Sequence, residues 1–376
     1  MSTLNVNTIN AATSGQAVAV DVKNPKSFRN LIINGAMNVA QRGTSTTTNA
    51  AFAIDRWKHT SNGLGVTITN SQQDLTSNDT PYSYGFRKSN RLALASAGTA
   101  GAGNYLQFWY TAEAQDIANS GWNYTSSSSY ITISFWARAS SSQTYGCVFE
   151  TNDGTAYLYP KTFALTADTW TKVSFSVPGN SNLTVNNDNG GGLMIKVFPY
   201  LGTTYSGGTD ATWAAASGNG YGSMGNTSTW LTTGASTFDL TGVQLEVGSY
   251  ATDFEHRSYG EELARCQRYC VNFGINAQLG LGQVYSGSGY VQLPVALPVP
   301  MRTKPSVSKN GSYWFNSNIG NSGYSGDRTV TVETPGGEAH MYRLFVAGGS
   351  DQGNATTVWC QLHDAAGTYM RLEAEI

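Results

Sequence analysis

Charged residues are scarce in this sequence. Of its 376 residues only 12% are charged, and the formal net charge is -2. Binding to a phosphate backbone or to an anionic membrane surface needs a cluster of Lys and Arg, and the sequence contains no such cluster. It also has no apolar run near the roughly 18 residues of a membrane span, and no basic segment followed by an apolar run at its N-terminus. We therefore expect a soluble, unprocessed chain with neither a nucleic acid nor a membrane as partner.

Helix-forming residues are also few. Leu, Lys and Glu are scarce, whereas Gly, Ser, Thr and Asn dominate and aromatic residues make up 12%. This composition favours strands and turns over helices. Because the length exceeds that of one ordinary domain, the sequence predicts an all-β protein of two or three domains.

The cysteines form no recognisable site. No CxxC pair occurs, and no histidine stands at the spacing of a zinc ligand. The four cysteines are Cys147, Cys266, Cys270 and Cys360. We expect them to be buried free thiols that pack as small apolar side chains. The sequence thus predicts neither a metal nor a cofactor.

Short strands separated by Gly-rich turns run from residue 29 to 257, which is typical of a jelly-roll β-sandwich. The stretch YITISFWARA at 130–139 shows the alternation most clearly. Ile133 belongs to its apolar face, whereas Tyr130 and Trp136 belong to the opposite face. That opposite face offers aromatic rings to a ligand, so Tyr130 and Trp136 are candidate glycan-binding residues.

Three further segments complete the organisation. In the last strand of the jelly roll, TFDLTGVQLEVG, the alternation changes phase, which predicts a bulge near Thr241 and Gly242. Residues 274–376 contain several more strands and predict a smaller C-terminal β-sandwich domain. Residues 1–28 are too short to bury a face of their own, so we expect them either to fray or to find a partner, which is the same segment of sister chains or a surface of a larger assembly. We favour the larger assembly.

A long Gly- and Ser-rich insertion at residues 202–232 carries four large aromatic side chains. They are Tyr205, Trp213, Tyr221 and Trp230. Long loops in compact domains are usually functional or disordered, and four large rings argue against disorder. We regard these residues as candidates for glycan contact, although a subunit interface would use them equally well. For Trp109 and Trp170, which lie on predicted strands, we favour packing.

The stretch SYGEELARCQRYC predicts a helical neck over residues 258–273. Ser258 and Glu261 form a capping box at its start. Apolar residues then follow at heptad spacing: Tyr259, Leu263, Cys266, Cys270 and Phe273. This spacing indicates a packing seam rather than a metal site. Because so short a helix is marginal alone, it must pack on its own domains or on copies of itself.

Several stretches together resemble the tail-fibre and related virion proteins of bacteriophages. They are RNLIINGAMNVAQRG at 29–43, AIDRW at 53–57, ITISFWARA, GVQLEVGSYATDFEHRSYGEELARCQRYC, LPVPMRTKP and the opening MSTLNVNTIN. The resemblance covers most of the chain in the expected order. It implies a jelly roll similar to carbohydrate-binding modules, a helical neck, a terminal β-domain and a homotrimer attached to a virion.

Some modules of this kind hold a structural calcium, which we do not expect here. The corresponding stretches are NGAMNVA and FDLTGVQ, in which Asp239 is the one nearby carboxylate. Positions that would need a carboxylate hold Ala36, Asn38, Thr241 and Gly242 instead.

The sequence offers weak support for an enzyme. Glu150, Asp153 and Asp55 could serve as the carboxylate pair of a glycoside hydrolase, but no motif supports them and a structural role is favoured. No nucleophile elbow, P-loop or dinucleotide motif occurs. We therefore expect no catalytic residues and no enzymatic activity.

The predicted function is that of a tail fibre or receptor-binding virion protein that adheres to host surface polysaccharide. Residues 1–28 would contact other virion proteins, and a homotrimer along the helical seam would raise apparent affinity. The alternatives are a purely structural head fibre or tail adaptor without glycan affinity and, less favoured, a polysaccharide depolymerase.

Overall fold

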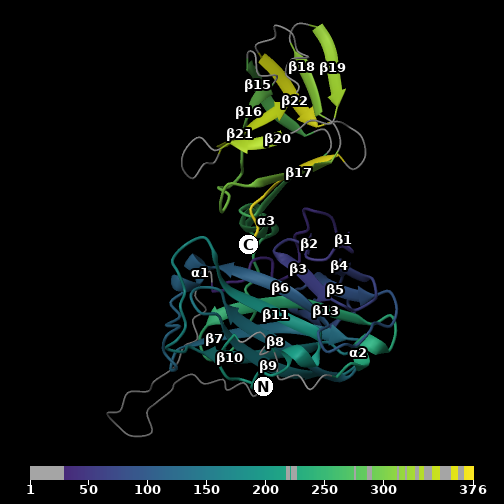
Figure 1. Cartoon of the computed structure of the whole chain (residues 1–376), viewed down its shortest axis with the longest axis vertical. Coiled ribbons are helices and arrows are strands. Elements are labelled where there is room, and N and C mark those ends of the chain that lie inside the picture. Colours follow the sequence, from purple (N-terminus) through teal and green to yellow (C-terminus); the bar gives the residue numbers. More distant parts are fainter. Residues whose placement is uncertain are drawn as a thin grey trace, which may run out of the picture.

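Two β-rich parts are stacked end to end, with helix α3 (Tyr259–Gln267) between them (Figure 1). The computed structural model describes residues 29–216, 221, 227–274, 277–285, 290–310, 313–317, 320–326, 330–333, 341–347, 357–362 and 368–376. The predicted attachment segment 1–28 lies outside the described residues. The all-β fold class predicted from composition is confirmed.

The N-terminal part is a sandwich of two antiparallel sheets. Sheet A has the order β1-β4-β5-β13-β7-β10 and sheet B the order β12-β9-β8-β11-β6-β3-β2, the crossed connectivity of a jelly roll. The strands of sheet A are β1 (Ser45–Thr46), β4 (Ile68–Asp74), β5 (Lys88–Leu94), β7 (Tyr130–Ala139), β10 (Thr171–Pro178) and β13 (Thr237–Val247). Those of sheet B are β2 (Phe52–Ile54), β3 (Trp57–Asn62), β6 (Tyr105–Glu113), β8 (Gln143–Thr151), β9 (Tyr157–Leu165), β11 (Gly191–Leu201) and β12 (Ala214–Ala215).

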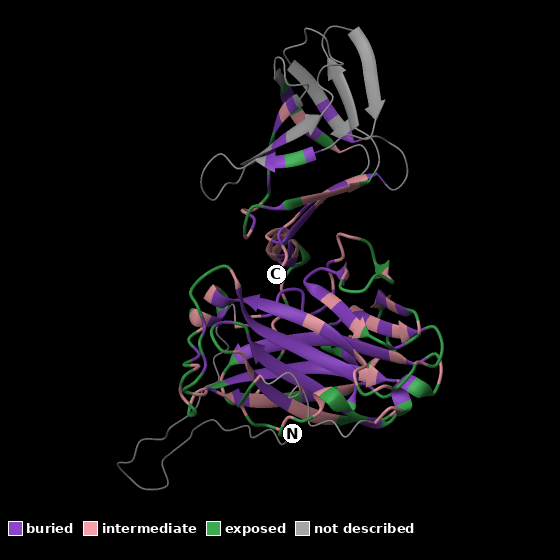
Figure 2. Cartoon of the chain, viewed as in Figure 1, coloured by how far each residue is buried: buried purple, intermediate pink, exposed green. Residues whose placement is uncertain are grey.

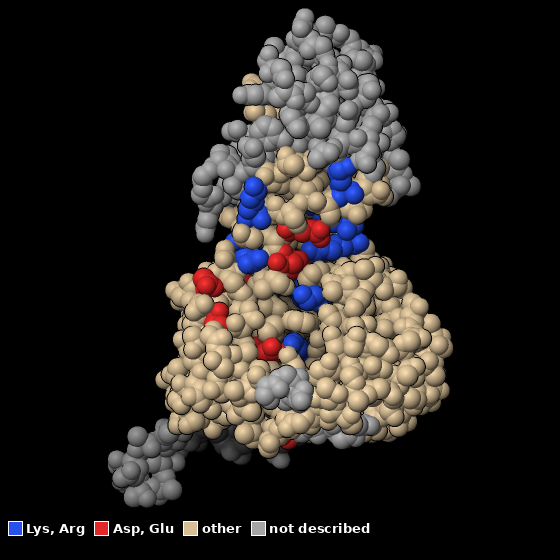
Figure 3. All heavy atoms as spheres, viewed as in Figure 1, with Lys and Arg blue, Asp and Glu red and all other residues tan. Residues whose placement is uncertain are grey.

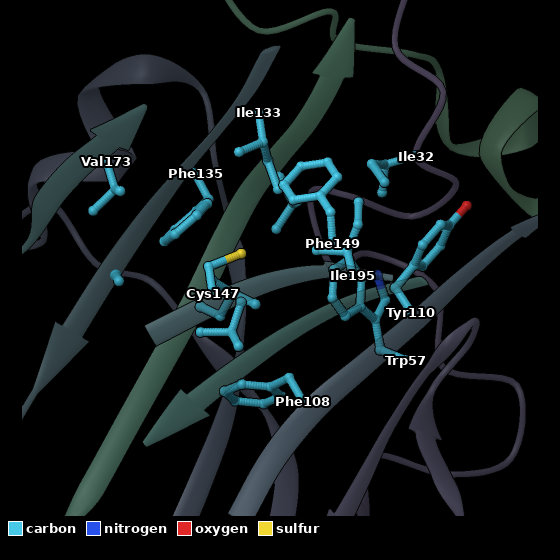
Figure 4. Close-up of a cluster of buried hydrophobic side chains, with 14 of the residues drawn as sticks. Ile32, Trp57, Phe108, Tyr110, Ile133, Phe135, Cys147, Phe149, Val173 and Ile195 are labelled. Atoms are coloured by element: carbon cyan, nitrogen blue, oxygen red, sulfur yellow. The ribbon is translucent and has the colours of Figure 1, made fainter. Parts of the chain in front are cut away.

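The core lies between these two sheets, where the strands are almost entirely buried (Figure 2). Figure 4 shows side chains from both sheets meeting there, among them Ile133 and Phe135 from β7 and Phe108, Cys147 and Ile195 from sheet B. The alternation predicted for residues 130–139 is confirmed, because the apolar face of β7 is fully buried in this core. Burial of so many large apolar side chains is the main source of stability.

The predicted bulge in β13 is also confirmed. The pairing of β13 with β7 shifts register between Thr241 and Gln244. Gly242 has a φ of 63°, a left-handed conformation that costs glycine little. A Cβ at this position would lie 2.6 Å from the Phe86 ring, so close packing also requires glycine here.

The C-terminal part contains two further sheets around a core of its own. A three-stranded sheet has the order β14-β23-β17, and a seven-stranded sheet has the order β19-β18-β22-β15-β16-β21-β20. The strands of the first are β14 (Cys270–Phe273), β17 (Ser306–Asn310) and β23 (Tyr369–Glu373). Those of the second are β15 (Gln278–Tyr285), β16 (Tyr290–Ala296), β18 (Tyr313–Ser317), β19 (Gly320–Gly326), β20 (Val330–Glu333), β21 (Met341–Ala347) and β22 (Thr357–Leu362). A smaller second β-domain was predicted, and the strand expected around Val291 and Leu293 is β16.

The described helices are short. Besides α3 they are α1 (Ala114–Ala118), α2 (Thr229–Thr232), and the 3-10 turns η1 (Thr80–Tyr84) and η2 (Thr203–Tyr205). None of the helices in the described part of the chain is long and apolar enough to cross a bilayer.

Helix α3 begins where the sequence predicted and ends earlier. The Ser258 hydroxyl accepts a hydrogen bond from the Glu261 amide at 3.2 Å, which caps the first turn. The helix stops at Gln267, so the predicted helix over residues 258–273 is wrong in its last part. Cys270 to Phe273 form β14 instead, which pairs with β23. The pairing of this segment with β23, about a hundred residues later in the chain, outweighs the helix that the heptad spacing indicated.

The five predicted seam residues therefore do not form one continuous stripe. Cys266 packs in a small cluster with Ile33, Val39 and Tyr269, with Leu263 beside it. Phe273 packs against the core of the C-terminal part, and the Tyr259 side chain is 60% exposed. Cys270 is buried in β14. Burial of free thiols, predicted for all four cysteines, is confirmed.

Charged side chains gather at the junction between the two parts, where Figure 3 shows most of the blue and red atoms of this view. Arg42 of the jelly roll pairs with Glu373 at 2.7 Å and with Glu375 at 3.0 Å. The Arg56 side chain is 1% exposed and pairs with the other oxygen of Glu375. These contacts attach the end of the chain to the jelly roll.

Candidate functional site

The six aromatic candidates are found in four different places. Tyr205 and Tyr221 lie over the outer face of sheet B, where they belong to one apolar cluster. Trp213 lies beside Tyr159 of β9, and Trp230 lies in the core. Tyr130 and Trp136 are both on β7 but differ in exposure.

Trp230 is not a glycan-binding residue in this structure. Its side chain is fully buried, and its indole Nε1 donates to the Thr237 carbonyl at 2.8 Å. The end of the predicted loop folds back as α2 and inserts this ring into the core. The candidate assignment of Trp230 was wrong because residues 202–232 are not a single exposed loop.

Trp213 anchors the loop to the rest of the sandwich. Its indole Nε1 donates to the Pro178 carbonyl at 2.7 Å, and its ring centroid lies 5.2 Å from that of Tyr159. The side chain is half-buried against the main core. It stands apart from Tyr205 and Tyr221.

Trp136 offers little surface to a ligand, since only 7% of it is exposed. It packs with Phe86 and Trp170, and the Tyr84 ring lies over it at a centroid distance of 5.1 Å. Tyr130, at the start of the same strand, is 37% exposed.

The outer face of sheet B brings together the most promising set of side chains. In β6, Tyr105, Gln107 and Trp109 point outward, while the residues between them enter the core. Trp109 pairs across the sheet with Lys58 of β3 on one side and with Lys196 of β11 on the other. Directly paired residues share one face, so both lysines flank the indole.

Rings and cations follow one another along this face. The ring centroids of Tyr105 and Tyr205 are 5.7 Å apart, and those of Tyr205 and Tyr221 are 6.1 Å apart. The Lys196 ammonium lies 4.8 Å from the Tyr221 ring and 4.4 Å from the Trp109 ring.

The series continues beyond Trp109. The Lys58 ammonium lies 4.8 Å from the Trp109 ring and 5.6 Å from the Phe52 ring. We call this series the aromatic–cation track, and its members are Tyr105, Tyr205, Tyr221, Lys196, Trp109, Lys58 and Phe52. All of them except Lys196 keep part of their surface exposed.

Polar contacts fix the side chains of the track. Lys196 forms a buried ion pair with Glu150 of β8. Burial lowers the pKa of the Lys196 ammonium, although the adjacent carboxylate acts in the opposite direction. The Trp109 indole donates to the Thr111 hydroxyl at 3.0 Å, which orients the ring. The track is therefore held in place before any ligand arrives.

The chemistry of the track suits a sugar better than a charged polymer. Pyranose rings have apolar CH faces that stack on flat aromatic rings, and hydroxyl groups that need donors and acceptors. Trp109, Tyr205 and Tyr221 supply partly exposed rings, and the tyrosine hydroxyl groups can donate and accept hydrogen bonds. The positive charge of Lys196 is neutralised by Glu150.

Comparison with solved structures found a phage tailspike domain and carbohydrate-binding modules that are similar to this chain. No protein-family model matches the sequence, and no curated protein matches it. A similar solved structure is the enzymatically active domain of tailspike protein 4 of bacteriophage CBA120, with 13% identity and a TM-score of 0.30. The similarity covers 58% of this chain and 21% of that chain.

Two carbohydrate-binding modules are similar to this chain over a little more than half of its length. A module of the CBM4 class has 15% identity and a TM-score of 0.31, and the match covers 57% of this chain and 98% of the module. The N-terminal cellulose-binding domain of a β-1,4-glucanase from Cellulomonas fimi has 14% identity and a TM-score of 0.27, covering 56% of this chain and 97% of that domain.

Arginine side chains contact both stretches where the sequence raised the question of calcium. Both oxygens of Asp239 accept from Arg91, at 2.8 and 3.0 Å. Near the opening NG turn, the Arg257 guanidinium donates to the Ile32 carbonyl at 3.0 Å and lies 3.6 Å from Glu262. Within the described residues no group of three or more His, Cys, Asp or Glu could hold a metal ion.

The carboxylates nominated for hydrolysis have structural partners. Glu150 pairs with Lys196, and Asp153 accepts from the Asn186 amide and side chain at 2.8 and 2.9 Å. Asp55 accepts from the Gln41 amide at 3.0 Å, and burial raises the pKa of its carboxyl.

Sequence reasoning missed the central members of the track. Trp109 was assigned to packing, and neither lysine was considered. A usable signal exists in LQFWYT, where Leu106 and Phe108 alternate with Gln107 and Trp109. That alternation places Trp109 on the outward face, but only the strand order shows which lysines flank it.

Proposed function

We propose that this chain is a bacteriophage virion protein that binds a host surface polysaccharide through the aromatic–cation track. The observation that carries glycan binding is the set of partly exposed rings fixed along one face of sheet B. The phage assignment is supported by the sequence resemblance of the jelly roll and of the stretch around α3. Residues 1–28 would attach the protein to the particle.

We infer binding without hydrolysis. Hydrolysis by the common mechanisms needs two carboxyl groups that flank the bond to be cut. Glu150, which lies beside the track, is engaged in an ion pair with Lys196. The polysaccharide would therefore be held intact.

A homotrimer would suit this function. A shallow site on an open sheet binds weakly, and three copies on one particle raise the apparent affinity through effective concentration. The molar mass of the recombinant chain in solution, measured by light scattering, distinguishes a trimer from a monomer.

Adhesion is tested with the full recombinant chain, bacterial cells and the polysaccharide extracted from them. Glycan arrays first identify a sugar class, and titration with the matching polysaccharide gives the affinity. We expect saturable binding and no change in polymer length after prolonged incubation. Absence of binding to every glycan and every cell type would leave a structural fibre or adaptor as the function, and shortening of the polymer would show a depolymerase.

A further inference from the structure

The Phe52 end of the aromatic–cation track is built against the junction between the two parts of the chain. Phe52 is half-buried in β2, a strand of three residues at the edge of sheet B. The Arg42 guanidinium lies 5.0 Å from the centre of the Phe52 ring, and the Lys58 ammonium lies 5.6 Å from it. So short a strand supplies few ladder hydrogen bonds, and the two cations therefore contribute to the position of this ring.

The last residues of the chain hold both cations. Arg42 Nε donates to Glu373 at 2.7 Å, and its Nη2 donates to Glu375 at 3.0 Å. Lys58 Nζ donates to the Ile376 carbonyl at 3.4 Å. Burial lowers the pKa of the Lys58 ammonium, and the negative charge of Glu375 acts in the opposite direction. Both cations that contact the ring are thus held by residues 373–376, which we call the chain end.

Phe52 lies at one extreme of the track. Strands β2, β3 and β6 are neighbours in this order in sheet B, so Phe52 and Trp109 are about 10 Å apart. Lys58 stands between these two rings, and Tyr221 lies on the other side of Trp109, beyond Lys196. A short sugar fragment therefore covers the centre of the track, and only a longer oligosaccharide extends over Phe52.

The two parts of the chain have separate hydrophobic cores. The buried residues of the jelly roll form one large cluster, and those of the C-terminal part form another. Ion pairs from Arg42 to Glu373 and Glu375 lie between them, among the charged side chains that Figure 3 shows at the junction. Parts with cores of their own keep their folds when the contacts between them weaken. A change at the chain end can therefore alter the Phe52 end of the track without unfolding sheet B.

We propose that the chain end positions the Phe52 end of the glycan site, so that docking of the C-terminal part strengthens the binding of an extended oligosaccharide by the jelly roll. This inference rests on the proposed function of the aromatic–cation track. Glu373 is a positioning residue, since it acts through Arg42, whereas Phe52 offers its own ring to a sugar. Rings that are held in place before binding lose less entropy when the sugar arrives.

The test uses the full chain and fragments of the bacterial polysaccharide that the wild type binds, prepared by partial hydrolysis. Two fragments are titrated: the shortest one that binds measurably and an octasaccharide. Glu373→Gln keeps the side-chain volume but removes the charge that holds Arg42. We expect the octasaccharide to bind this variant about threefold more weakly than the wild type, and the short fragment to bind both proteins equally. Phe52→Ala should show the same dependence on length with a larger loss, about tenfold.

Glu261→Gln is the matched control, because it makes the same charge-to-amide change in the exposed pair with Arg265 of α3. It should leave the affinity for both fragments unchanged, and circular dichroism checks the folding of every variant. Two results for Glu373→Gln would overturn the inference: an unchanged affinity for the octasaccharide, or an equal loss for both fragments. Unchanged binding of the octasaccharide by Phe52→Ala would also overturn it. A wild type that binds no polysaccharide would remove the proposed function, and this inference with it.

Discussion

At the scale of single residues, His59 lies in β3 with its imidazole inside the sandwich, 1% exposed. Burial lowers the pKa of this imidazole from 6.5 to about 4. Between these values the unfolded chain binds a proton that the folded chain does not bind. Stability conferred by the neutral imidazole is thus complete above pH 6.5 and is lost as the pH falls towards 4.

We predict that His59→Leu is less sensitive to acid than the wild-type protein. The wild type should lose about 2 to 3 kcal/mol more than the variant between pH 6.5 and pH 4.5, since each pKa unit corresponds to about 1.4 kcal/mol. Urea unfolding at the two pH values measures this difference. Equal losses in both proteins would show that His59 is protonated in the folded state.

The four thiols should be unreactive in the folded protein. Burial raises the pKa of Cys360 to about 12 and raises those of Cys147, Cys266 and Cys270 as well. Since the thiolate is the reactive form, we predict negligible labelling by an aromatic disulfide reagent in native buffer at pH 8 and four labelled thiols per chain in denaturant. Rapid labelling of any thiol in native buffer would contradict the burial described here.

Trp109 shows what residue patterns can and cannot predict. Its outward direction follows from the alternation of β6, so it was open to prediction. Its neighbours Lys58 and Lys196 come from strands distant in the sequence, and only strand order places them beside it. By contrast, Trp230 sits in a stretch rich in Gly and Ser, and no local pattern indicates that α2 inserts it into the core.

At the scale of secondary structure elements, period-two alternation identified strands reliably, including β7, β10 and β16. One face of each of these strands is buried in a core, so apolar and polar residues alternate in the sequence and the strand can be identified from it. The end of α3 was not predictable in the same way. Val271 and Phe273 pair with β23 at the far end of the chain, and this long-range pairing decides that the helix stops.

Two glycines in different elements should respond oppositely to alanine. Gly242 in the β13 bulge has a φ of 63° and lies close to Phe86, so Gly242→Ala should destabilise the protein by about 2 kcal/mol or more. Gly260 in the first turn of α3 has no atom within 4 Å of its Cβ position, so Gly260→Ala should stabilise by about 0.5 kcal/mol.

Urea unfolding of the two variants beside the wild type gives both free energies. A neutral result for Gly242→Ala would mean that the bulge can relax without cost. A loss of stability in Gly260→Ala would mean that this part of α3 contacts another surface, such as a sister chain.

At the scale of the whole molecule, the end of the chain holds the two parts together. Glu375 pairs with Arg42 at 3.0 Å and with the buried Arg56. Arg302 donates to the Ala374 carbonyl at 2.8 Å, which adds a contact from the C-terminal part. A buried cation without its partner is costly, so these pairs make the docking of the two parts specific.

We predict that Glu375→Gln destabilises the protein by about 3 kcal/mol, because it removes the carboxylate that neutralises Arg56. Glu261→Gln is the matched control, since Glu261 forms an exposed pair with Arg265 at 3.2 Å and should change stability by less than about 0.5 kcal/mol. Thermal unfolding should show earlier melting only for Glu375→Gln. Equal effects of the two substitutions on the melting temperature would show that the Glu375 ion pairs do not stabilise the junction.

The measurement that bears most directly on glycan binding by the aromatic–cation track is a comparison of Trp109→Ala with Trp213→Ala. Both remove a half-buried tryptophan from the jelly roll, but only Trp109 belongs to the track. Titration with the polysaccharide that the wild type binds should show about thirtyfold weaker binding for Trp109→Ala, the loss typical of a central aromatic contact, and little change for Trp213→Ala. Unchanged affinity in a folded Trp109→Ala variant would contradict glycan binding on sheet B.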